Sequence, residues 1–168
     1  MTITMYQASV PVLTRALANL DAYLKKGEDY ATERGFDPAV LLSARLAPDM
    51  FPLTRQVQIA CDHAKNAPSR LAGRDLVPMA DTETTFAELH ERIAKVQAHI
   101  ATFTPADIDG SEDRDIVVKM RSGELKLTGL PYLQAFAMPN FWFHVTIAYA
   151  ILRHNGVPVG KMDFTGRP

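Results

Sequence analysis

The chain has 168 residues, long enough for one domain with a sizeable hydrophobic core and too short for two ordinary ones. Eighteen Lys and Arg residues against 19 Asp and Glu residues give a formal net charge of −1. No excess of positive charge is therefore available for a phosphate backbone or an anionic membrane. We predict a single domain over residues 1–168 and expect no nucleic-acid partner.

Cysteine content and the N-terminal residues indicate the cellular compartment. The single cysteine, Cys61, cannot form an internal disulfide, which is typical of a reducing compartment, and it excludes a zinc cluster built from cysteines. The N-terminal residues have no basic segment followed by an uninterrupted apolar one, so they do not resemble a signal peptide. The apolar run 148–152 is far shorter than a membrane span. We expect a cytoplasmic protein with no membrane partner.

Apolar residues at three- and four-residue steps predict long amphipathic helices. The first covers residues from about 6 to 26 and is followed by a connection, 27–50, with short helical turns. The second begins near Phe51 and ends at Gly73, and Pro68 is expected to kink or shorten it.

The third helix follows a predicted loop over residues 73–84. Thr85 and Glu88 have the spacing of a capping box, and the apolar steps behind them continue to Phe103. This combination of a start signal and an apolar stripe predicts an amphipathic helix.

Between the third and fourth helices, an alternating pattern over residues 115–128 predicts a β-hairpin with Ser122 and Gly123 as its turn. The predicted cross-strand pairs are Met120 with Leu125, Val118 with Leu127, Arg121 with Glu124, and Lys119 with Lys126. Since a lone hairpin is marginally stable, its apolar face is expected to rest on the helices.

The fourth helix is predicted to open at Thr128 and Pro131 and to close at Gly156, with an interruption at Pro139. The tail after it has two prolines and two glycines and is expected to be extended, packed or frayed. Each helix has one apolar stripe that only helical neighbours can cover, so the sequence predicts an all-α four-helix bundle with an inserted hairpin. An α/β sheet is the weaker alternative, because only two strands are visible.

Two histidines are candidate ligands of a divalent metal. His144 and Asn140 lie four residues apart, so on a helix their side chains point the same way, roughly 6 Å apart. His63 shares a face of the second helix with Gln56. A bundle core can assemble a metal site from facing helices, and imidazole suits a divalent transition metal. The alternative is that both are core histidines satisfied by hydrogen bonds, because a catalytic metal usually needs three protein ligands and asparagine is a weak third.

The remaining candidate groups are predicted to have other roles. His154 is expected to be a cation favourable to the C-terminal end of its helix. His90 and His99 are expected to be solvated. Cys61 and His63 are turned about 200° apart on a helix, so Cys61 is expected to be an inert core residue. The aromatic residues 141–143 circle their helix, which predicts that at least one ring faces another subunit or a pocket.

The stretches MFPLTRQVQIACDHAKNAPSRLAG (50–73) and LPYLQAFAMPNFWFHVTIAYAILRHNGVPVGKMDF (130–164) resemble an uncharacterised family of unknown function. That family is similar in fold to the DinB/YfiT-like metalloenzymes. The resemblance spans nearly the whole chain and implies a four-helix bundle that forms a homodimer. In the wider superfamily, a histidine on the second helix and an H-x-x-x-H pair on the fourth hold a nickel- or zinc-type divalent metal. Some members transfer small thiols or isomerise thiol adducts.

Carried over to this chain, the resemblance implies metal ligands at His63 and His144, with Asn140 where the superfamily has the first histidine of the pair. Two functions stay open. In one, the protein is an enzyme of the thiol transferase or hydrolase type, whose divalent metal activates a bound thiol or water. In the other, it is a non-catalytic, degenerate-site dimer that binds a small molecule or a partner protein.

Overall fold

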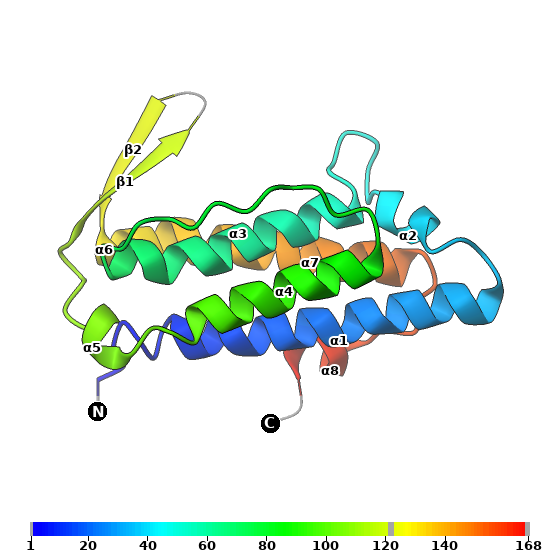
Figure 1. Ribbon diagram of the computed structural model, residues 1–168, viewed down its shortest axis with the longest axis horizontal. Coiled ribbons are helices and arrows are strands. Elements are labelled where there is room, and N and C mark those ends of the chain that lie inside the picture. The colour runs from blue at the N-terminus through cyan, green and yellow to red at the C-terminus, as the bar shows by residue number, and fades with distance from the viewer. Residues whose placement is uncertain (1, 121–122, 167–168) are drawn as a thin grey trace.

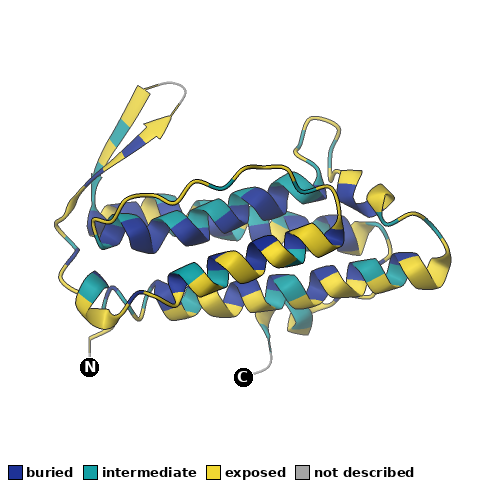
Figure 2. Ribbon diagram, viewed as in Figure 1, coloured by how far each residue is buried: buried dark blue, intermediate teal, exposed yellow. Residues whose placement is uncertain are grey.

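The computed structural model describes residues 2–120 and 123–166. Over this part of the chain the fold is mostly helical, with an antiparallel hairpin of two strands. The long helices are α1 (Val10–Arg34), α3 (Leu53–Leu71), α4 (Phe86–Ile100) and α7 (Met138–His154). They lie side by side (Figure 1), and their buried residues line their inward sides (Figure 2). Helices α3 and α1 each contact both α4 and α7.

Helix α1 is longer than predicted, because residues 27–34 continue the helix and do not form a connection. Gly27 lies inside it, at a point where a Cβ atom would come within 2.8 Å of the Leu152 side chain on α7. This glycine therefore serves close packing between helices. The helix ends at Gly35, whose φ of 72° is the left-handed conformation that closes many helices. A short helix, α2 (Ala39–Ser43), follows within the predicted connection.

Helices α3 and α4 agree with the prediction. Helix α3 runs to Leu71 with Pro68 in its last turn, so the proline does not shorten it. Helix α4 begins at the predicted capping box: the Thr85 hydroxyl accepts the Glu88 N–H at 3.2 Å, and the Glu88 carboxylate accepts the Thr85 N–H at 3.0 Å. The apolar residues that α4 buries are Phe86, Leu89, Ile93, Val96 and Ile100.

The hairpin forms with a register different from the predicted one. Strand β1 (Asp115–Met120) pairs antiparallel with β2 (Gly123–Thr128), and the observed partners include Ile116 with Leu127, Val118 with Leu125, Lys119 with Glu124 and Met120 with Gly123. The predicted pairing of Arg121 and the turn at Ser122 involve residues outside the described part of the chain. In the observed register Lys119 lies opposite Glu124 and not opposite Lys126. Opposite charges across a strand pair are favourable and like charges are not.

Only the base of the hairpin is buried. Ile116 and Val118 of β1 are 4% and 5% exposed, while Met120 is 43% exposed. Figure 1 shows the reason, since the hairpin leaves the end of the helical core and projects away from it. The expectation that the apolar face of the hairpin is covered therefore holds at Ile116 and Val118 but not at Met120.

The fourth long helix is continuous across Pro139. The elements α6 (Gly129–Pro131) and η1 (Tyr132–Ala137) lead directly into α7, and η1 is a π-helix. In a regular α-helix a proline ring clashes with the carbonyl four residues earlier, and the wider π turns before Pro139 relieve that clash. Among the described residues, this is the one helix, Gly129–His154, that is long and apolar enough to cross a membrane by length and composition. A core helix of a soluble protein passes the same test, so this is weak evidence for a membrane.

The C-terminal tail contains a short helix, α8 (Lys161–Thr165), where the sequence predicts none. The Asp163 carboxylate accepts the Gly160 N–H at 2.7 Å at its start and pairs with Lys26 of α1 at 2.6 Å. Two turns earlier on α1, the Asn19 amide donates to the Phe164 carbonyl at 3.1 Å. The tail is thus packed against α1.

A further helical turn, α5 (Pro105–Ile108), precedes the hairpin and was also not predicted. It begins with a capping box in which the Asp107 carboxylate accepts the N–H and the hydroxyl of Thr104, both at 2.8 Å. Ile108 at its end is fully buried. The turn therefore closes the end of the core from which the hairpin leaves.

Candidate functional site

His63 and His144 lie next to each other where α3 packs on α7. Their ring centroids are 6.1 Å apart and their ring planes differ by 14°. Both side chains are half-buried. The structure therefore brings together the two histidines that the sequence singled out, at the edge of the core and not in its middle.

Gln56 holds His144 from the facing helix. The Gln56 side chain is 1% exposed, and its Oε1 atom lies 2.7 Å from Nδ1 of His144. Its Nε2 atom donates to the Phe51 carbonyl at 3.0 Å. One nitrogen of His144 is therefore satisfied by a buried amide that is itself anchored. The spacing of seven residues puts Gln56 on the helix face of His63 but does not indicate its contact with His144.

His63 has a different environment from His144. Its ring lies 5.8 Å from that of Phe136 at an angle of 60°, and it forms no hydrogen bond with any residue in the described ranges. The His63 side chain is half-buried, and neither of its nitrogens is among the fully buried side-chain atoms that lack a partner. The alternative in which both histidines are satisfied by protein hydrogen bonds thus describes one nitrogen of His144 and neither nitrogen of His63.

Asn140 lies one turn before His144 on α7. Its Nδ2 atom donates to the Phe136 carbonyl at 2.7 Å, four residues earlier on the same helix. Because a carbonyl oxygen can only accept, the atom of Asn140 that faces it must be the NH₂ nitrogen. The Asn140 Oδ1 atom is left as a neutral oxygen acceptor, on the helix that carries His144.

The surroundings keep both imidazoles uncharged at neutral pH. Burial, together with the charges of His144 and Arg70, lowers the pKa of His63 to about 4. Burial and the nearby Arg55 lower the pKa of His144 to about 4. Neutral imidazole is the form that accepts a hydrogen bond or a metal ion. The pair can therefore act as a base or a ligand, and it is not a source of positive charge.

The donor set does not fit a catalytic metal centre. Catalytic zinc sites have three protein ligands and an open position, whereas this site offers two imidazoles and one neutral amide. Within residues 2–120 and 123–166, no group of three or more His, Cys, Asp or Glu side chains could hold a metal ion. Arg55 and Arg70 add positive charge near the pair, which disfavours a divalent cation further.

The other candidate groups lie away from this pair. His90 and His99 are half-buried and not solvated as expected: Nδ1 of His90 is 2.6 Å from the Asp21 carboxylate, and Nε2 of His99 is 3.1 Å from the Ser69 hydroxyl. Both contacts join α4 to another helix, which sequence spacing cannot reveal. Burial raises the pKa of the Cys61 thiol to about 12, so it stays protonated and inert, in line with the prediction.

A buried arginine that the sequence analysis did not single out organises a second polar cluster. The Arg92 side chain on α4 is 1% exposed and pairs with the carboxylates of Asp62 at 3.1 Å, Asp81 at 3.0 Å and Glu83 at 3.0 Å. It also donates to the Ala80 carbonyl at 2.9 Å. Three of these groups belong to the segment 72–85, which returns along α3 to the start of α4 (Figure 1). Arg92 thereby fastens this segment to the helices.

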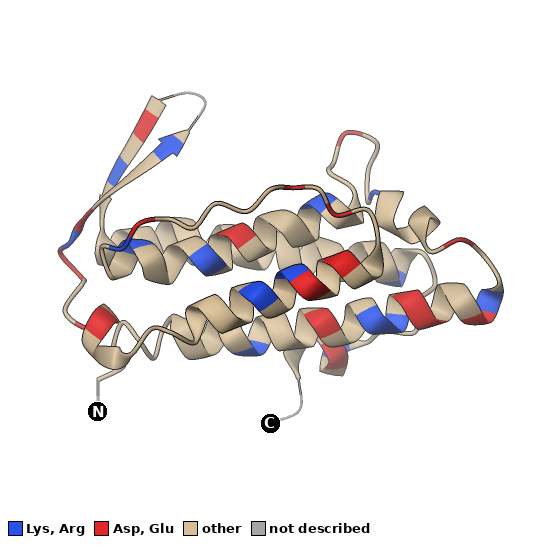
Figure 3. Cartoon of the chain, in the orientation of Figure 1, with Lys and Arg blue, Asp and Glu red and all other residues tan. Residues whose placement is uncertain are grey.

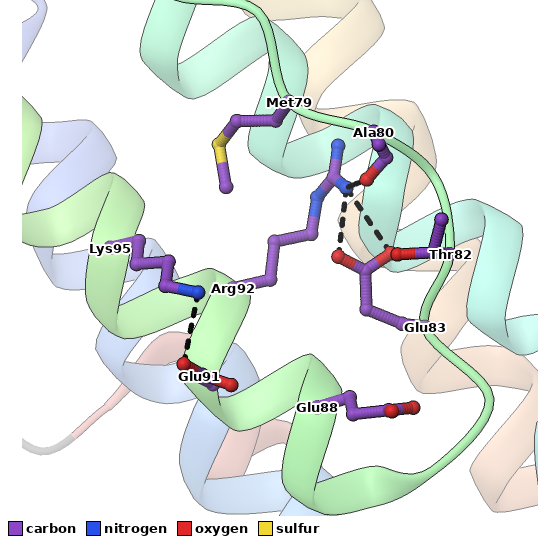
Figure 4. Close-up of a pocket in the computed structure, with 8 residues that line it drawn as sticks. All are labelled: Met79, Ala80, Thr82, Glu83, Glu88, Glu91, Arg92 and Lys95. Atoms are coloured by element: carbon purple, nitrogen blue, oxygen red, sulfur yellow. Dashed lines mark hydrogen bonds and ion pairs between the residues drawn. The ribbon is translucent and has the colours of Figure 1, made fainter.

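A cavity of about 360 Å³ lies beside this cluster and shares no residue with the histidine pair. Figure 4 shows Arg92 and Glu83 on one side of it and the ion pair of Lys95 with Glu91, 2.9 Å apart, on the other. Every charged group that Figure 4 joins by a dashed line already has an opposite partner. Asp62 also pairs with Lys65, and Asp81 also pairs with Arg55, so three basic side chains offset the three acidic ones. The cluster is therefore a neutral structural feature, and the histidine pair remains the candidate site.

Comparisons with known proteins identify relatives of the chain. The family model described as "Domain of unknown function (DUF1993)" matches residues 5–165. Among solved structures, the chain is similar to a DinB family member protein from Shewanella denitrificans, with 42% sequence identity and a TM-score of 0.89. That match covers 97% of this chain and 92% of the other. No curated protein matches the chain.

Proposed function

We propose, from the premise that this chain belongs to the DUF1993 family of domains of unknown function, that it is a single-domain four-helix bundle of the DinB type. The contacts of α3 and α1 with both α4 and α7 support this architecture. The DinB family member of known structure, which matches over nearly its full length, supports it as well. The domain would extend over residues 1–168.

The site supports binding without catalysis best. In this proposal, His63 and His144 are a degenerate form of a metal site, and they bind a small molecule through uncharged imidazole nitrogens. One observation carries this proposal: the His63 and His144 rings lie 6.1 Å apart, and the third predicted metal ligand, one turn before His144, is the neutral amide of Asn140. Nitrogen atoms without protein partners are then free to accept a hydrogen bond from a ligand, and no strong third donor is available for a metal.

A second copy of the chain is proposed as the partner, on the outward face of α7. Residues 127–152 contain no Lys, Arg, Asp or Glu, and most of α7 is uncoloured in Figure 3 where α1 and α4 carry charges. Phe143 on α7 is 53% exposed, and Leu130 on α6 is 37% exposed. Exposed aromatic and apolar side chains on an uncharged segment are typical of protein interfaces, and two-fold dimers are the commonest oligomers.

The cellular setting is a proposal from composition. The balanced charge supports a protein without a nucleic-acid or membrane partner, and the single cysteine supports the cytoplasm. Retention on heparin at moderate salt would contradict the first of these statements.

A divalent-metal enzyme is the second candidate, and one contact favours it. Metal-binding histidines usually donate their other ring nitrogen to a fixed acceptor, and Gln56 supplies such an acceptor to His144. If a metal such as nickel or zinc bound here, His63, His144 and Asn140 would hold it, and it would supply Lewis-acid activation of a bound thiol or water. The shortage of strong donors places this reading second.

Elemental analysis of protein purified without a histidine tag separates the two candidates. The proposal predicts protein free of stoichiometric metal, with a thermal unfolding midpoint that a chelator does not change. A stoichiometric metal that is lost in a folded His144→Ala variant would contradict the proposal and support the enzyme.

A further inference from the structure

Gln56 has the environment of a residue with one defined task. It lies on α3, is 1% exposed, and uses both ends of its amide: one toward the Phe51 carbonyl, the other toward Nδ1 of His144. A buried amide with both ends engaged is held in one orientation here, because a flipped side chain would place its oxygen against the Phe51 carbonyl oxygen, which can only accept.

That orientation can be derived from the partners alone. The Phe51 oxygen is a carbonyl and can only accept, so the Gln56 group 3.0 Å from it is the NH₂ end. The opposite end is then the oxygen Oε1, which can also only accept. The His144 nitrogen 2.7 Å from Oε1 must therefore carry a hydrogen.

The protonation state of the rest of the ring follows. A neutral imidazole carries one N–H, and His144 carries it on Nδ1, so Nε2 has the free electron pair. No hydrogen bond joins Nε2 to a residue within 2–120 or 123–166. We infer that Gln56 is a positioning residue that fixes His144 in the Nδ1–H tautomer, so that the site takes a ligand through a hydrogen-bond donor of that ligand.

The ligand class is narrowed by the rings next to His144. Its ring centroid lies 5.2 Å from that of Phe143, at an angle of 90°, and 6.1 Å from that of His63, and Phe143 is 53% exposed. An exposed aromatic ring beside an acceptor nitrogen suits a small molecule with an apolar ring and an O–H, N–H or S–H group. This class rests on the proposed function, since it assumes that the histidine pair binds a small molecule; the role of Gln56 does not.

Nitrogen-15 NMR of the imidazole rings tests the positioning role directly, because the protonated and unprotonated ring nitrogens resonate far apart. The expected result is a wild-type His144 with Nδ1 protonated and Nε2 unprotonated at pH 7. Gln56→Glu retains an oxygen acceptor and should keep Nδ1 protonated, whereas Gln56→Met, of similar length, should lose this preference. A wild-type ring protonated on Nε2, or an unchanged tautomer in Gln56→Met, would overturn the inference. Circular dichroism checks that Gln56→Met is folded; if it is not, the wild-type and Gln56→Glu spectra decide.

Titration with phenol and with toluene then tests the ligand class on the same labelled protein. The two molecules have nearly the same size, and only phenol donates a hydrogen bond. A shift of the His144 Nε2 resonance with phenol and not with toluene supports the class. No shift with phenol, in a protein whose tautomer is as inferred, rejects the class and the small-molecule function while the role of Gln56 stands.

Discussion

The imidazole rings of His63 and His144 lie 6.1 Å apart, on helices that sequence alone leaves unplaced relative to each other. The two residues are 81 positions apart in the chain, so only the packing of α3 on α7 brings them together. Their proximity disfavours protonation, because His144 is one of the groups that lower the pKa of His63. The folded protein therefore favours two neutral rings over two charged ones.

This relationship predicts that stability falls when the pH is lowered from about 6.5 to about 4. In the unfolded chain both histidines bind protons below their ordinary pKa of 6.5, whereas in the folded protein they do so only below about 4. The unfolded state thus binds more protons in this window, so acid favours unfolding, and the effect levels off below it. Burial also lowers the pKa of His99, which adds an effect of the same sign.

Urea unfolding at several pH values measures this dependence. A His63→Gln, His144→Gln double variant should have a flatter profile between pH 6.5 and pH 4 than the wild type, and His99→Gln measures the separate share of that residue. An equally steep profile in the double variant would show that the pair does not titrate as described.

Arg92 predicts a large loss of stability on truncation. Arg92→Met removes the one guanidinium that Asp62, Asp81 and Glu83 share, and leaves their partly buried carboxylates without it. Removing one partner from a buried ion cluster typically costs about 3–5 kcal/mol. The matched control is Arg55→Met, because Arg55 also pairs with Asp81 but its side chain is 36% exposed, and exposed pairs contribute about 0–1 kcal/mol.

The free energy of unfolding in urea compares these two variants, and limited proteolysis locates the change. Cleavage within residues 72–85 should increase in Arg92→Met and stay near the wild-type rate in Arg55→Met. Equal losses of stability in both variants would contradict a special role for the buried cluster.

Two glycines make a matched pair for a packing test. A Cβ atom on Gly129 would lie 1.9 Å from the Ser111 backbone oxygen, whereas a Cβ atom on Gly160 would meet nothing within 4 Å. Since backbone must move to admit the new methyl group, Gly129→Ala should cost at least about 1–3 kcal/mol. Gly160→Ala should stay within about 0.5 kcal/mol of wild type. Thermal unfolding followed by circular dichroism distinguishes them, and similar midpoints would refute the close approach at Gly129.

The dimer proposal predicts that Phe143→Glu is monomeric. The charge would lie within the uncharged stretch 127–152, and the fold itself should be little affected because Phe143 is 53% exposed. Val40→Glu is the control, since Val40 on α2 is an equally exposed apolar residue, at 56%, outside that stretch. Sedimentation equilibrium gives the mass of each protein. A monomeric wild type, or a dimeric Phe143→Glu variant, would count against this interface.

Features set by neighbouring residues could be predicted from the sequence. The capping box of Thr85 and Glu88 and the apolar stripe behind it fix the start and the buried face of α4 within a few turns. The apolar alternation of β1 and β2 likewise fixes which side chains share a face, although the register differs by two residues, because Gly123, predicted in the turn, pairs with Met120. A slip of two leaves the faces unchanged, which is why the apolar set survives the error.

Features set by distant residues could not be predicted. Gly27 suggests the end of a helix until Leu152 is known to pack against it. Pro139 suggests an interruption of the fourth helix until the π turns before it are known. The same holds for the site. The sequence and the family resemblance pointed to His63 and His144, but the partner of His144 is fixed by a 2.7 Å contact across two helices.

Arg92 shows what signal was available. It lies beside the apolar stripe of α4, in contact range of an acidic run in the preceding segment that contains Asp81 and Glu83. A charged residue next to a buried stripe indicates a buried ion pair only once its partners are known to fold back over it. That return of residues 72–85 is a tertiary event.

Titration calorimetry with Zn²⁺, on wild type and on Asn140→His, tests the degenerate site most directly. The degenerate site should bind Zn²⁺ weakly in the wild type, with a Kd above about 1 µM, which corresponds to a binding free energy weaker than about −8 kcal/mol. Because Asn140→His supplies the missing third imidazole, it should bind zinc at least about tenfold more tightly, a gain of about 1.4 kcal/mol or more. Wild-type binding far tighter than 1 µM that Asn140→His does not improve would show a complete metal site and contradict the account.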